Sequence, residues 1–282
     1  MNLTFLGTSA ANAYPLAFCQ CGNCGRAREL GGPSLRRRSS ALINDDLLID
    51  LGPDVITGSF LAGRSLARVR YCLQTHSHAD HLDPSHFEPR TAEWAVVGVP
   101  RLHFYASAAT ARKVAAHYEG FYDPVNLLDQ EVGERLNLEV HQIEVLQSFA
   151  FDSYRVTALP ANHDPSVDPL LYAVEGQGRS IFYGVDTAAL PEDTWQAFHR
   201  YQLRFDVVIL DHTYGPGVPG ADHLSADRFI EHAARLREEG LLAEGARILA
   251  THISHEGNPP HPELMDFAAQ YGYEVAYDGL TV

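Results

Sequence analysis

Short apolar runs separated by turn-forming residues dominate the amino-terminal part of the chain. Residues Asn2–Leu6 and Val69–Leu73 are typical of buried strands, because each is a brief and mostly apolar stretch. Between them, Ala41–Ile49 predicts a hairpin that turns at residues 44–46, where Asn and Asp follow one another. The Gly, Pro and Arg content from Gly7 to Arg38 predicts a long loop excursion rather than a core element.

The remainder of the chain alternates between strand-like and helix-like patterns. The helical period predicts helices over Pro84–Ala95, Ala108–Tyr118, Pro191–Tyr201, Ala226–Glu239 and Pro262–Tyr271. Short apolar runs predict strands over Tyr154–Leu159, Ser180–Val185, Val207–Leu210, Arg247–Thr251 and Glu274–Tyr277. No internal repeat or low-complexity tract interrupts this order. The periodicity therefore indicates an α/β fold.

Length and charge narrow the class of protein. The 282 residues suit one large domain over residues 1–282. With 21 basic and 36 acidic residues the net charge is −15, which argues against broad binding to nucleic acid or to an anionic membrane. No apolar run approaches the roughly 20 residues that span a bilayer, and Met1–Leu6 lacks the parts of a signal peptide. We therefore expect a cytoplasmic protein.

Candidate metal-binding side chains are concentrated directly after the predicted strand Val69–Leu73. It reads Thr-His-Ser-His-Ala-Asp-His over residues 75–81 and holds four candidate metal ligands, His76, His78, Asp80 and His81. Imidazole and carboxylate ligands suit Zn, Mn or Fe better than a soft metal that prefers thiolates. A solvated histidine-rich loop or a tag remnant is the alternative. A tag would lie at a terminus and would lack the interleaved Asp.

Three of the four cysteines form a second candidate site. Cys19, Cys21 and Cys24 have the spacing CxCxxC. In a reducing compartment such a cluster favours a metal over disulfides, and three thiolates need a fourth ligand to complete a tetrahedron. We expect His255 to supply it. Reduced cysteines on a turn are the alternative, and the fourth cysteine, Cys72, is expected to be a core residue.

The pattern HxHxDH at residues 76–81 resembles the signature of the metallo-β-lactamase superfamily. That resemblance implies an αββα sandwich of two mixed sheets flanked by helices. It also implies three later ligands at strand ends, which His163, Asp186 and His252 match in order. One metal ion would then be held by His76, His78 and His163, and the other by Asp80, His81 and His252. Asp186 would bridge the two ions.

The cysteine cluster narrows the resemblance. A CxCxxC insertion soon after the first strand, together with HxxH at His252 and His255, resembles the PhnP type of the superfamily. Members of that type are cyclic phosphodiesterases accessory to carbon-phosphorus lyase. The resemblance implies a structural zinc ion held by Cys19, Cys21, Cys24 and His255 in the excursion of about residues 7–40.

The resemblance also implies the reaction. Paired ions lower the pKa of a bridging water and clamp the oxygens of a displacement at phosphorus. A metal-bound hydroxide would attack a small cyclic phosphate or related diester, and His223 would protonate the leaving oxygen. Asp211 is expected to orient His223, although a strand-end turn residue is the alternative for it. We therefore predict a metal-dependent phosphoric diester hydrolase in which His223, Asp211 and the ligand Asp80 take part in catalysis.

Other functions within the superfamily stay open at this stage. A tRNA 3′-processing nuclease commonly carries a long basic arm between the third His and the bridging Asp, whereas only 22 residues, 164–185, separate His163 from Asp186. A thioesterase or lactamase would use the same metals on a carbonyl carbon. A non-enzymatic PqqB-like cofactor carrier often lacks part of the ligand set. Zn and Mn are not distinguished, nor is a monomer distinguished from a homodimer.

The remaining histidines and a basic run receive ordinary structural interpretations. We expect His212 to lie at the surface. The same is expected of His86, His103, His117, His141, His199, His232 and His261. The run Arg36–Arg38 is interpreted as a solvated loop, with contact to an anionic substrate as the alternative. The aromatic segment from His117 to Asp123 could form a lid or pack in the core.

Overall fold

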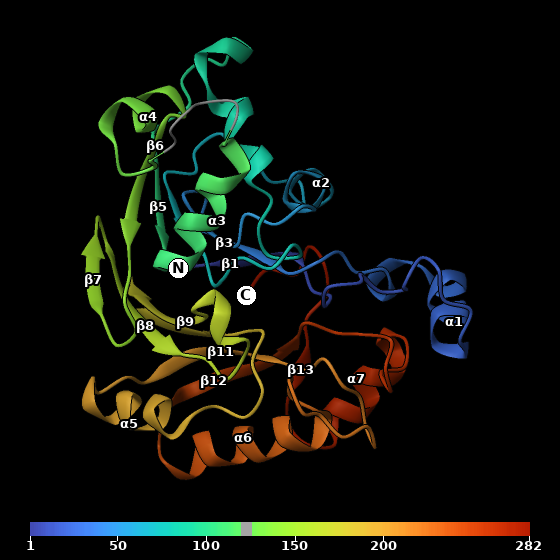
Figure 1. Cartoon of the computed structure of the whole chain (residues 1–282). Helices are drawn as coiled ribbons and strands as arrows, with labels where there is room; N and C mark the ends of the chain where they lie inside the picture. The colour runs from blue at the N-terminus through green and yellow to red at the C-terminus, as the bar shows by residue number, and fades with distance from the viewer. Residues whose placement is uncertain (120–125) are drawn as a thin grey trace.

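The computed structural model describes residues 1–119 and 126–282, whose strands form two sheets (Figure 1). The first sheet has the order β1 (Leu3–Gly7), β2 (Ser40–Ile43), β3 (Leu47–Ile49), β4 (Tyr71–Leu73), β5 (Leu102–Ala106), β6 (Leu138–Gln142). The second has the order β13 (Glu274–Val275), β12 (Leu242–Thr251), β11 (Phe205–Asp211), β10 (Arg179–Gly184), β9 (Leu170–Gly176), β8 (Tyr154–Pro160), β7 (Ser148–Phe151). Each sheet contains both parallel and antiparallel pairs, as predicted.

Helices cover the outer face of each sheet (Figure 1). The first sheet is accompanied by α2 (Val55–Leu61), η2 (Pro84–Arg90), η3 (Ala92–Trp94), α3 (Ala108–Tyr118) and α4 (Gln130–Arg135). The second is covered by α5 (Glu192–Arg200), α6 (Ala226–Glu238) and α7 (His261–Ala269). Two short elements, α1 (Gly22–Leu30) and η1 (Gly32–Ser34), lie in the excursion after β1, and η4 (Pro165–Val167) follows β8.

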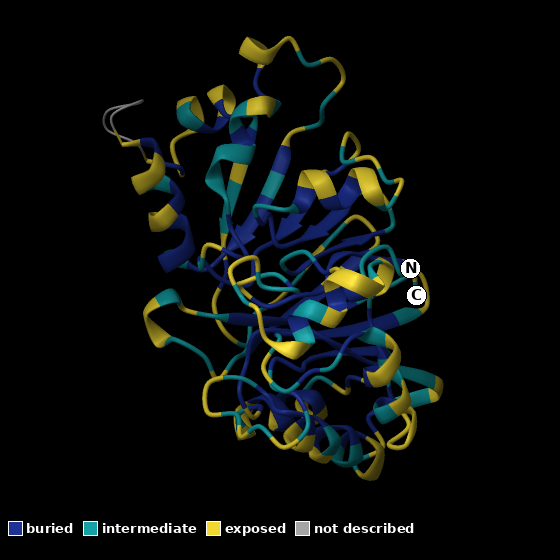
Figure 2. Cartoon of the chain, turned by 90° about the vertical axis from the view of Figure 1, so that its right-hand side faces the viewer, coloured by how far each residue is buried: buried dark blue, intermediate teal, exposed yellow. Residues whose placement is uncertain are grey.

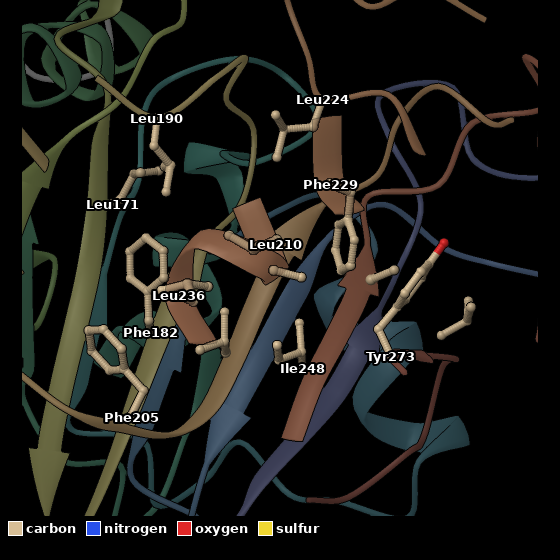
Figure 3. Close-up of a cluster of buried hydrophobic side chains, with 14 of the residues drawn as sticks. Leu171, Phe182, Leu190, Phe205, Leu210, Leu224, Phe229, Leu236, Ile248 and Tyr273 are labelled. Atoms are coloured by element: carbon tan, nitrogen blue, oxygen red, sulfur yellow. The ribbon is translucent and has the colours of Figure 1, made fainter. Parts of the chain in front are cut away.

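The alternation of side chains along each strand builds the layers. In β10, Ile181 and Tyr183 pack toward the first sheet, whereas Phe182 between them packs under the helices. The ring of Phe182 lies 5.0 Å from that of Phe198 in α5 and 5.4 Å from that of Phe205. Figure 3 shows this helix-covered core, which is one of three apolar layers. The predicted αββα sandwich is thereby confirmed.

Most predicted elements are present, but the prediction of one helix is wrong. Residues Pro84–Ala95 form two short 3₁₀ helices instead of one α-helix. Pro89 lies inside the first of these, where it lacks the N–H that an α-helix would use. The excursion after β1 also differs from the expectation, since it contains α1 and contributes Tyr14 and Cys24 to the buried core.

Burial follows the layers (Figure 2). The residues of the strands are mostly buried, shown in dark blue, and the helices expose one face to solvent. Among the described residues, no helix has the length and apolar content that a bilayer crossing requires. The aromatic segment from His117 to Asp123 lies outside the described residues from position 120 onward, while Tyr118 at the end of α3 is buried.

Candidate metal centres

The segments with predicted ligands meet where strands of both sheets end. The loop of residues 74–83 follows β4, and His163 lies just beyond β8. Asp186 lies just beyond β10, and His252 directly follows β12. The backbone at Asp186 and His252 is left-handed, with φ of 62° and 59°. Such backbone is costly for residues other than glycine, so its presence here indicates that the surrounding fold fixes the direction of both side chains.

The first group of side chains contains His76, His78, His163 and Asp186. Their ligand atoms all lie within 4.8 Å of one another. His76 Nε2 lies 3.0 Å from Asp186 Oδ2, and His163 Nε2 lies 3.0 Å from His78 Nδ1. The structure therefore brings together the three histidines that the sequence assigned to one ion, with Asp186 beside them.

The second group contains Asp80, His81, His252 and, again, Asp186. His81 Nε2 lies 3.1 Å from Asp80 Oδ2, 3.1 Å from Asp186 Oδ2 and 3.3 Å from His252 Nε2. All four residues are at least nine-tenths buried. Asp186 is the one residue common to both groups, and this is the position that a bridging carboxylate needs.

The unpaired atoms at this centre fit divalent cations. His76 Nε2, His163 Nδ1 and Asp186 Oδ1 are buried and form no hydrogen bond of good geometry, although His76 Nε2 lies 3.0 Å from Asp186 Oδ2 and His223 Nδ1 lies 3.0 Å from Asp186 Oδ1. An unsatisfied buried polar group costs about 1–3 kcal/mol. In the described part of the chain, no Lys or Arg pairs with Asp80 or Asp186. Two divalent ions would supply both the missing partners and the missing positive charge.

In the first group the pKa shifts agree with this interpretation. Burial alone would raise the pKa of Asp186, but the imidazoles of His252, His223 and His76 hold it well below its ordinary value. Burial lowers the pKa of His163 to about 4 against the opposing effect of Asp186. A carboxylate that stays ionised and an imidazole that stays neutral are the protonation states that bind a metal ion.

In the second group the pKa values of the histidines shift in the other direction. Burial lowers the pKa values of His81 and His252, but the neighbouring carboxylates raise them above the ordinary value. These two rings must therefore release a proton to bind an ion.

A buried carboxylate that the sequence analysis missed supports the second group. Asp50 follows β3 with a left-handed φ of 63° and is fully buried. Its Oδ2 lies 2.7 Å from His81 Nδ1, and its Oδ1 accepts hydrogen bonds from Thr75 and Gln74. Partners of this kind orient a histidine ligand and raise its basicity. Gly52 belongs to the same packing, because a Cβ there would lie 2.7 Å from the Asp80 carbonyl oxygen.

Two other candidate ligands, His76 and His252, are held in the same way. Thr75 Oγ1 lies 3.0 Å from His76 Nδ1. The Nδ1 atom of His252 lies 2.8 Å from Thr213 Oγ1 and 3.1 Å from Asp211 Oδ2. The far nitrogens of three histidines are therefore already engaged, which leaves their near nitrogens for an ion.

His223 lies at the rim of the same centre. It lies in the segment between β11 and α6, and its Nδ1 lies 3.1 Å from Asp211 Oδ2 and 3.0 Å from Asp186 Oδ1. Burial lowers the pKa of His223, but the two carboxylates raise it to about 11. Within the described residues, no hydrogen bond to its Nε2 is found. The two carboxylates therefore favour the protonated ring, and one of its nitrogens has no hydrogen bond to any residue that the structure describes.

The four residues of the cysteine cluster also meet. Cys19, Cys21, Cys24 and His255 place their ligand atoms within 4.8 Å of one another. His255 Nδ1 lies 3.5 Å from Cys21 Sγ and 3.7 Å from Cys19 Sγ. Zinc bound tetrahedrally at ordinary bond lengths separates sulfur from nitrogen by about 3.5 Å. The N–H of Cys24 and the ring of His255 lower the pKa of Cys21 to about 6, which favours its thiolate.

Three structural interpretations of the sequence are wrong. His212 is fully buried and its Nε2 lies 3.1 Å from the Tyr273 hydroxyl, so it is a core residue rather than a surface one. His232 is also buried, and it accepts a hydrogen bond from the Leu190 N–H. The run Arg36–Arg38 is not a freely solvated loop, because Arg36 is buried and the partly exposed Arg37 and Arg38 form ion pairs.

The three arginines attach the excursion to the body of the protein. The buried Arg36 guanidinium donates to Thr8 and to the Ala276 carbonyl. Arg37 and Arg38 form ion pairs with Asp278 and Asp54, respectively. These partners are distant in sequence, so a local pattern could not reveal them.

A family model described as a beta-lactamase superfamily domain matches residues 46–253. No curated protein matches the chain. A diphosphatase from the PhnP family has a similar structure, at 22% identity and a TM-score of 0.73, over 100% of this chain and 96% of that one.

Two further structures are similar over the whole of this chain. Zn²⁺-bound PqqB from Methylobacterium extorquens has 17% identity and a TM-score of 0.69, with 99% of that chain covered. The short form of human tRNase Z has 18% identity and a TM-score of 0.64, with 98% of that chain covered. At these identities the likeness concerns the fold.

Proposed function

Because the chain belongs to the beta-lactamase superfamily, we propose that this metallo-β-lactamase-fold hydrolase is a metal-dependent phosphodiesterase. Its substrate is a small cyclic phosphate or a related phosphodiester. The observation that carries the proposal is the pair formed by His223 and Asp211 at the rim of the histidine centre, with their side chains 3.1 Å apart.

The chain offers a complete set of ligands for two divalent ions, Zn or Mn. His76, His78 and His163 would hold one ion, Asp80, His81 and His252 the other, and Asp186 would bridge them. When bound, such ions stabilise negative charge at phosphorus and lower the pKa of a water held between them. Asp50 and Thr213 orient His81 and His252 through hydrogen bonds to the ring nitrogens that face away from the ions.

The protein's own contribution to bond cleavage is the proton. An alkoxide that leaves from phosphorus needs a proton donor. In hydrolysis at a carbonyl carbon the leaving atom is a different one, such as the sulfur of a thioester or the nitrogen of a β-lactam. Asp211 accepts from His223 Nδ1 and fixes the ring, which leaves Nε2 free to face a bound substrate. A protonated imidazole held in this way donates its Nε2 proton to the departing oxygen.

We also propose that Cys19, Cys21, Cys24 and His255 bind a structural zinc ion. His255 lies three residues after the ligand His252, so the ion would join the excursion to the strand end that carries His252. The excursion already contacts this strand end, because Ser9 donates to the Ile253 carbonyl. Zinc would therefore stabilise a contact that the fold makes independently.

The similar structures support phosphorus chemistry, since a diphosphatase and a tRNA-processing enzyme are among them. A tRNA substrate is disfavoured by the net charge of −15. Within the described residues, only η4, β9 and β10 lie between His163 and Asp186, which leaves no basic arm there. A carrier role like that suggested by the likeness to PqqB would not need the His223–Asp211 pair.

A substrate panel tests the proposal. The purified protein is analysed for bound metals and assayed with nucleoside and sugar cyclic phosphates, linear diesters, a thioester and a β-lactam. We expect hydrolysis of at least one phosphodiester, with no comparable turnover of the carbonyl substrates. Activity confined to the thioester or the β-lactam would contradict the proposal, as would a metal-replete protein without activity on any phosphodiester.

A further inference from the structure

We propose that His103, Glu139 and His141 form a further metal site, separate from both centres described above. The site would bind a divalent transition ion such as Zn²⁺ through two imidazoles and one carboxylate. Sequence analysis treated both histidines as ordinary surface groups. The structure instead places the three side chains in one cluster, with ligand atoms within 4.8 Å of one another.

The register of two parallel strands produces the cluster. His103 of β5 lies opposite Glu139 of β6, and Tyr105 lies opposite His141. Residues two apart on a strand point to the same face of the sheet, so Glu139 and His141 share a face. Their neighbour His103 lies on that face as well, because its ring nitrogen reaches that of His141.

The distances are those of ligands around one ion. His103 Nδ1 lies 3.1 Å from His141 Nε2. Glu139 Oε2 lies 3.7 Å from His103 Nδ1, and its Oε1 lies 3.6 Å from His141 Nε2. An ion with bonds of 2.0–2.2 Å to tetrahedral ligands separates their atoms by about 3.3–3.6 Å. The three side chains need only small adjustments to reach that geometry.

Hydrogen bonding alone does not account for Glu139. The two imidazoles form one hydrogen bond to each other, but a separation of 3.6 Å is too long for a hydrogen bond from either ring to the carboxylate. The carboxylate nevertheless faces both nitrogens, with one oxygen toward each ring. An ion between the three groups gives every one of these atoms a direct partner.

The surroundings keep the rings in place. Tyr105 stacks on His141 with ring centroids 4.5 Å apart, and Tyr71 stacks on His103 at 5.5 Å. The histidine side chains are about one-third exposed, at 32% and 31%, so an ion can enter from solvent. Burial lowers the pKa of His141, which favours the neutral ring that binds a metal.

The site lies on β5 and β6 and shares no residue with the histidine centre. His103 is paired with Tyr71, the first residue of β4, whereas the candidate ligand His76 follows the end of that strand. An ion here would join β5 to β6, which is the last strand of its sheet. Two His and one Glu leave a coordination position open for water. The expected effect is stabilisation of this edge by zinc.

The test is a zinc titration of the full-length, metal-replete protein and of two variants. We expect the wild type to take up one Zn²⁺ per chain beyond its resident ions. His141→Gln should abolish this uptake, and Glu139→Gln, which keeps the pair of imidazoles, should weaken it by at least about tenfold. Zinc should raise the Tm of the wild type but not that of His141→Gln.

The matched control is His199→Gln. His199 is an exposed histidine whose Nε2 lies 2.7 Å from a single carboxylate oxygen of Glu239. This variant should bind the extra ion as the wild type does. Equal uptake by wild type, His141→Gln and Glu139→Gln would overturn the proposal, and so would loss of the extra ion in His199→Gln. Hydrolytic activity does not enter this readout, so the result is independent of the proposed function.

Discussion

The histidine centre and the cysteine cluster are both candidate metal sites, yet the chain builds them in different ways. At the histidine centre the ligands follow strands of two sheets and are held by buried partners such as Asp50 and Thr213. In the cysteine cluster the thiols lie in a loop and at the start of the short helix α1, and Cys21 is exposed. Only His255 reaches it from the opposite end of the chain.

The fold itself positions the side chains of the histidine centre, whereas the cysteine cluster needs an ion to complete it. Strand ends and outer hydrogen bonds hold the side chains of the histidine centre, which is the arrangement expected of a reaction centre. Among the described residues, the cysteine cluster has outer support only through its backbone and the buried Cys24, since Asn23 and Arg28 donate to the carbonyl oxygens of His255 and Cys19 rather than to the ligand atoms. We therefore expect the positions of its side chains to depend more on the ion. Metal removal from the histidine centre should abolish activity but leave the local structure nearly unchanged. Metal removal from the cysteine cluster should loosen the local structure but leave activity nearly unchanged.

The largest effect is expected from the residue that joins both halves of the histidine centre. Asp186→Ala should remove both ions and lower turnover by about 10⁴-fold or more, because several kcal/mol of charge stabilisation is lost at each ion. Metal analysis should still find one zinc ion at the cysteine cluster. Retention of three ions per chain with near wild-type turnover would contradict the bridging role.

Loss of an outer partner should have an intermediate effect. Asp50→Asn removes the charge that orients His81 while keeping the shape of the side chain. We expect metal affinity or turnover to fall by about 10–100-fold. Asp45→Asn, on an exposed turn beyond β2, is the control and should change neither. An unaltered metal affinity and turnover in Asp50→Asn would show that the ligands do not need this support.

A ligand change in the cysteine cluster should leave catalysis nearly intact. Cys21 is the N-cap of α1, and serine is a good N-cap, so Cys21→Ser removes a thiolate while preserving the helix start. One zinc ion should be lost and turnover should stay within about tenfold of wild type, since no ligand of the histidine centre is touched. Amide hydrogen exchange should speed up in residues 8–38 but not at the strand ends. Unchanged exchange there would contradict an ion-dependent loop.

The smallest expected effect is a pH dependence of stability that arises from the contact between Arg36 and His261. Burial and Arg36 lower the pKa of His261 to about 4, below the ordinary 6.5. The stability gained from the neutral ring is therefore complete above pH 6.5 and is lost as pH falls toward 4. The stability difference between wild type and His261→Gln should shrink over this range, by at most about 1.4 kcal/mol per pH unit. Urea unfolding at pH 7 and pH 5 measures it, and a constant difference would contradict the assignment.

Local sequence patterns predicted what is local in this fold. The candidate ligands of residues 76–81, which the structure brings together, belong to one motif. Ala108–Tyr118 is a helix with the predicted bounds because its helical period is uninterrupted. Asp50 has no motif around it, and its role arises only because β3 lies beside β4. The strand β5 was missed since His103 interrupts a short apolar run.

The expected burial of a residue was wrong where a partner distant in sequence determines it. His212 is buried because Phe229 and Tyr273 pack against it from α6 and from the residue before β13. Nothing within a few residues of His212 indicates this contact. Arg36 likewise finds its partners near both ends of the chain. Contacts of this kind require the assembled sheets, so a single sequence does not reveal them.

The most direct test of the account compares two leaving groups in wild type and His223→Ala. Both proteins are first shown to hold the same metal content. For a diester with an alkoxide leaving group, the variant should lose about 10²-fold or more in kcat, since this oxygen must be protonated. For the 4-nitrophenyl ester, whose leaving group needs no proton, the loss should be below about tenfold. Equal losses for both esters, or no loss for either, would contradict proton donation by His223.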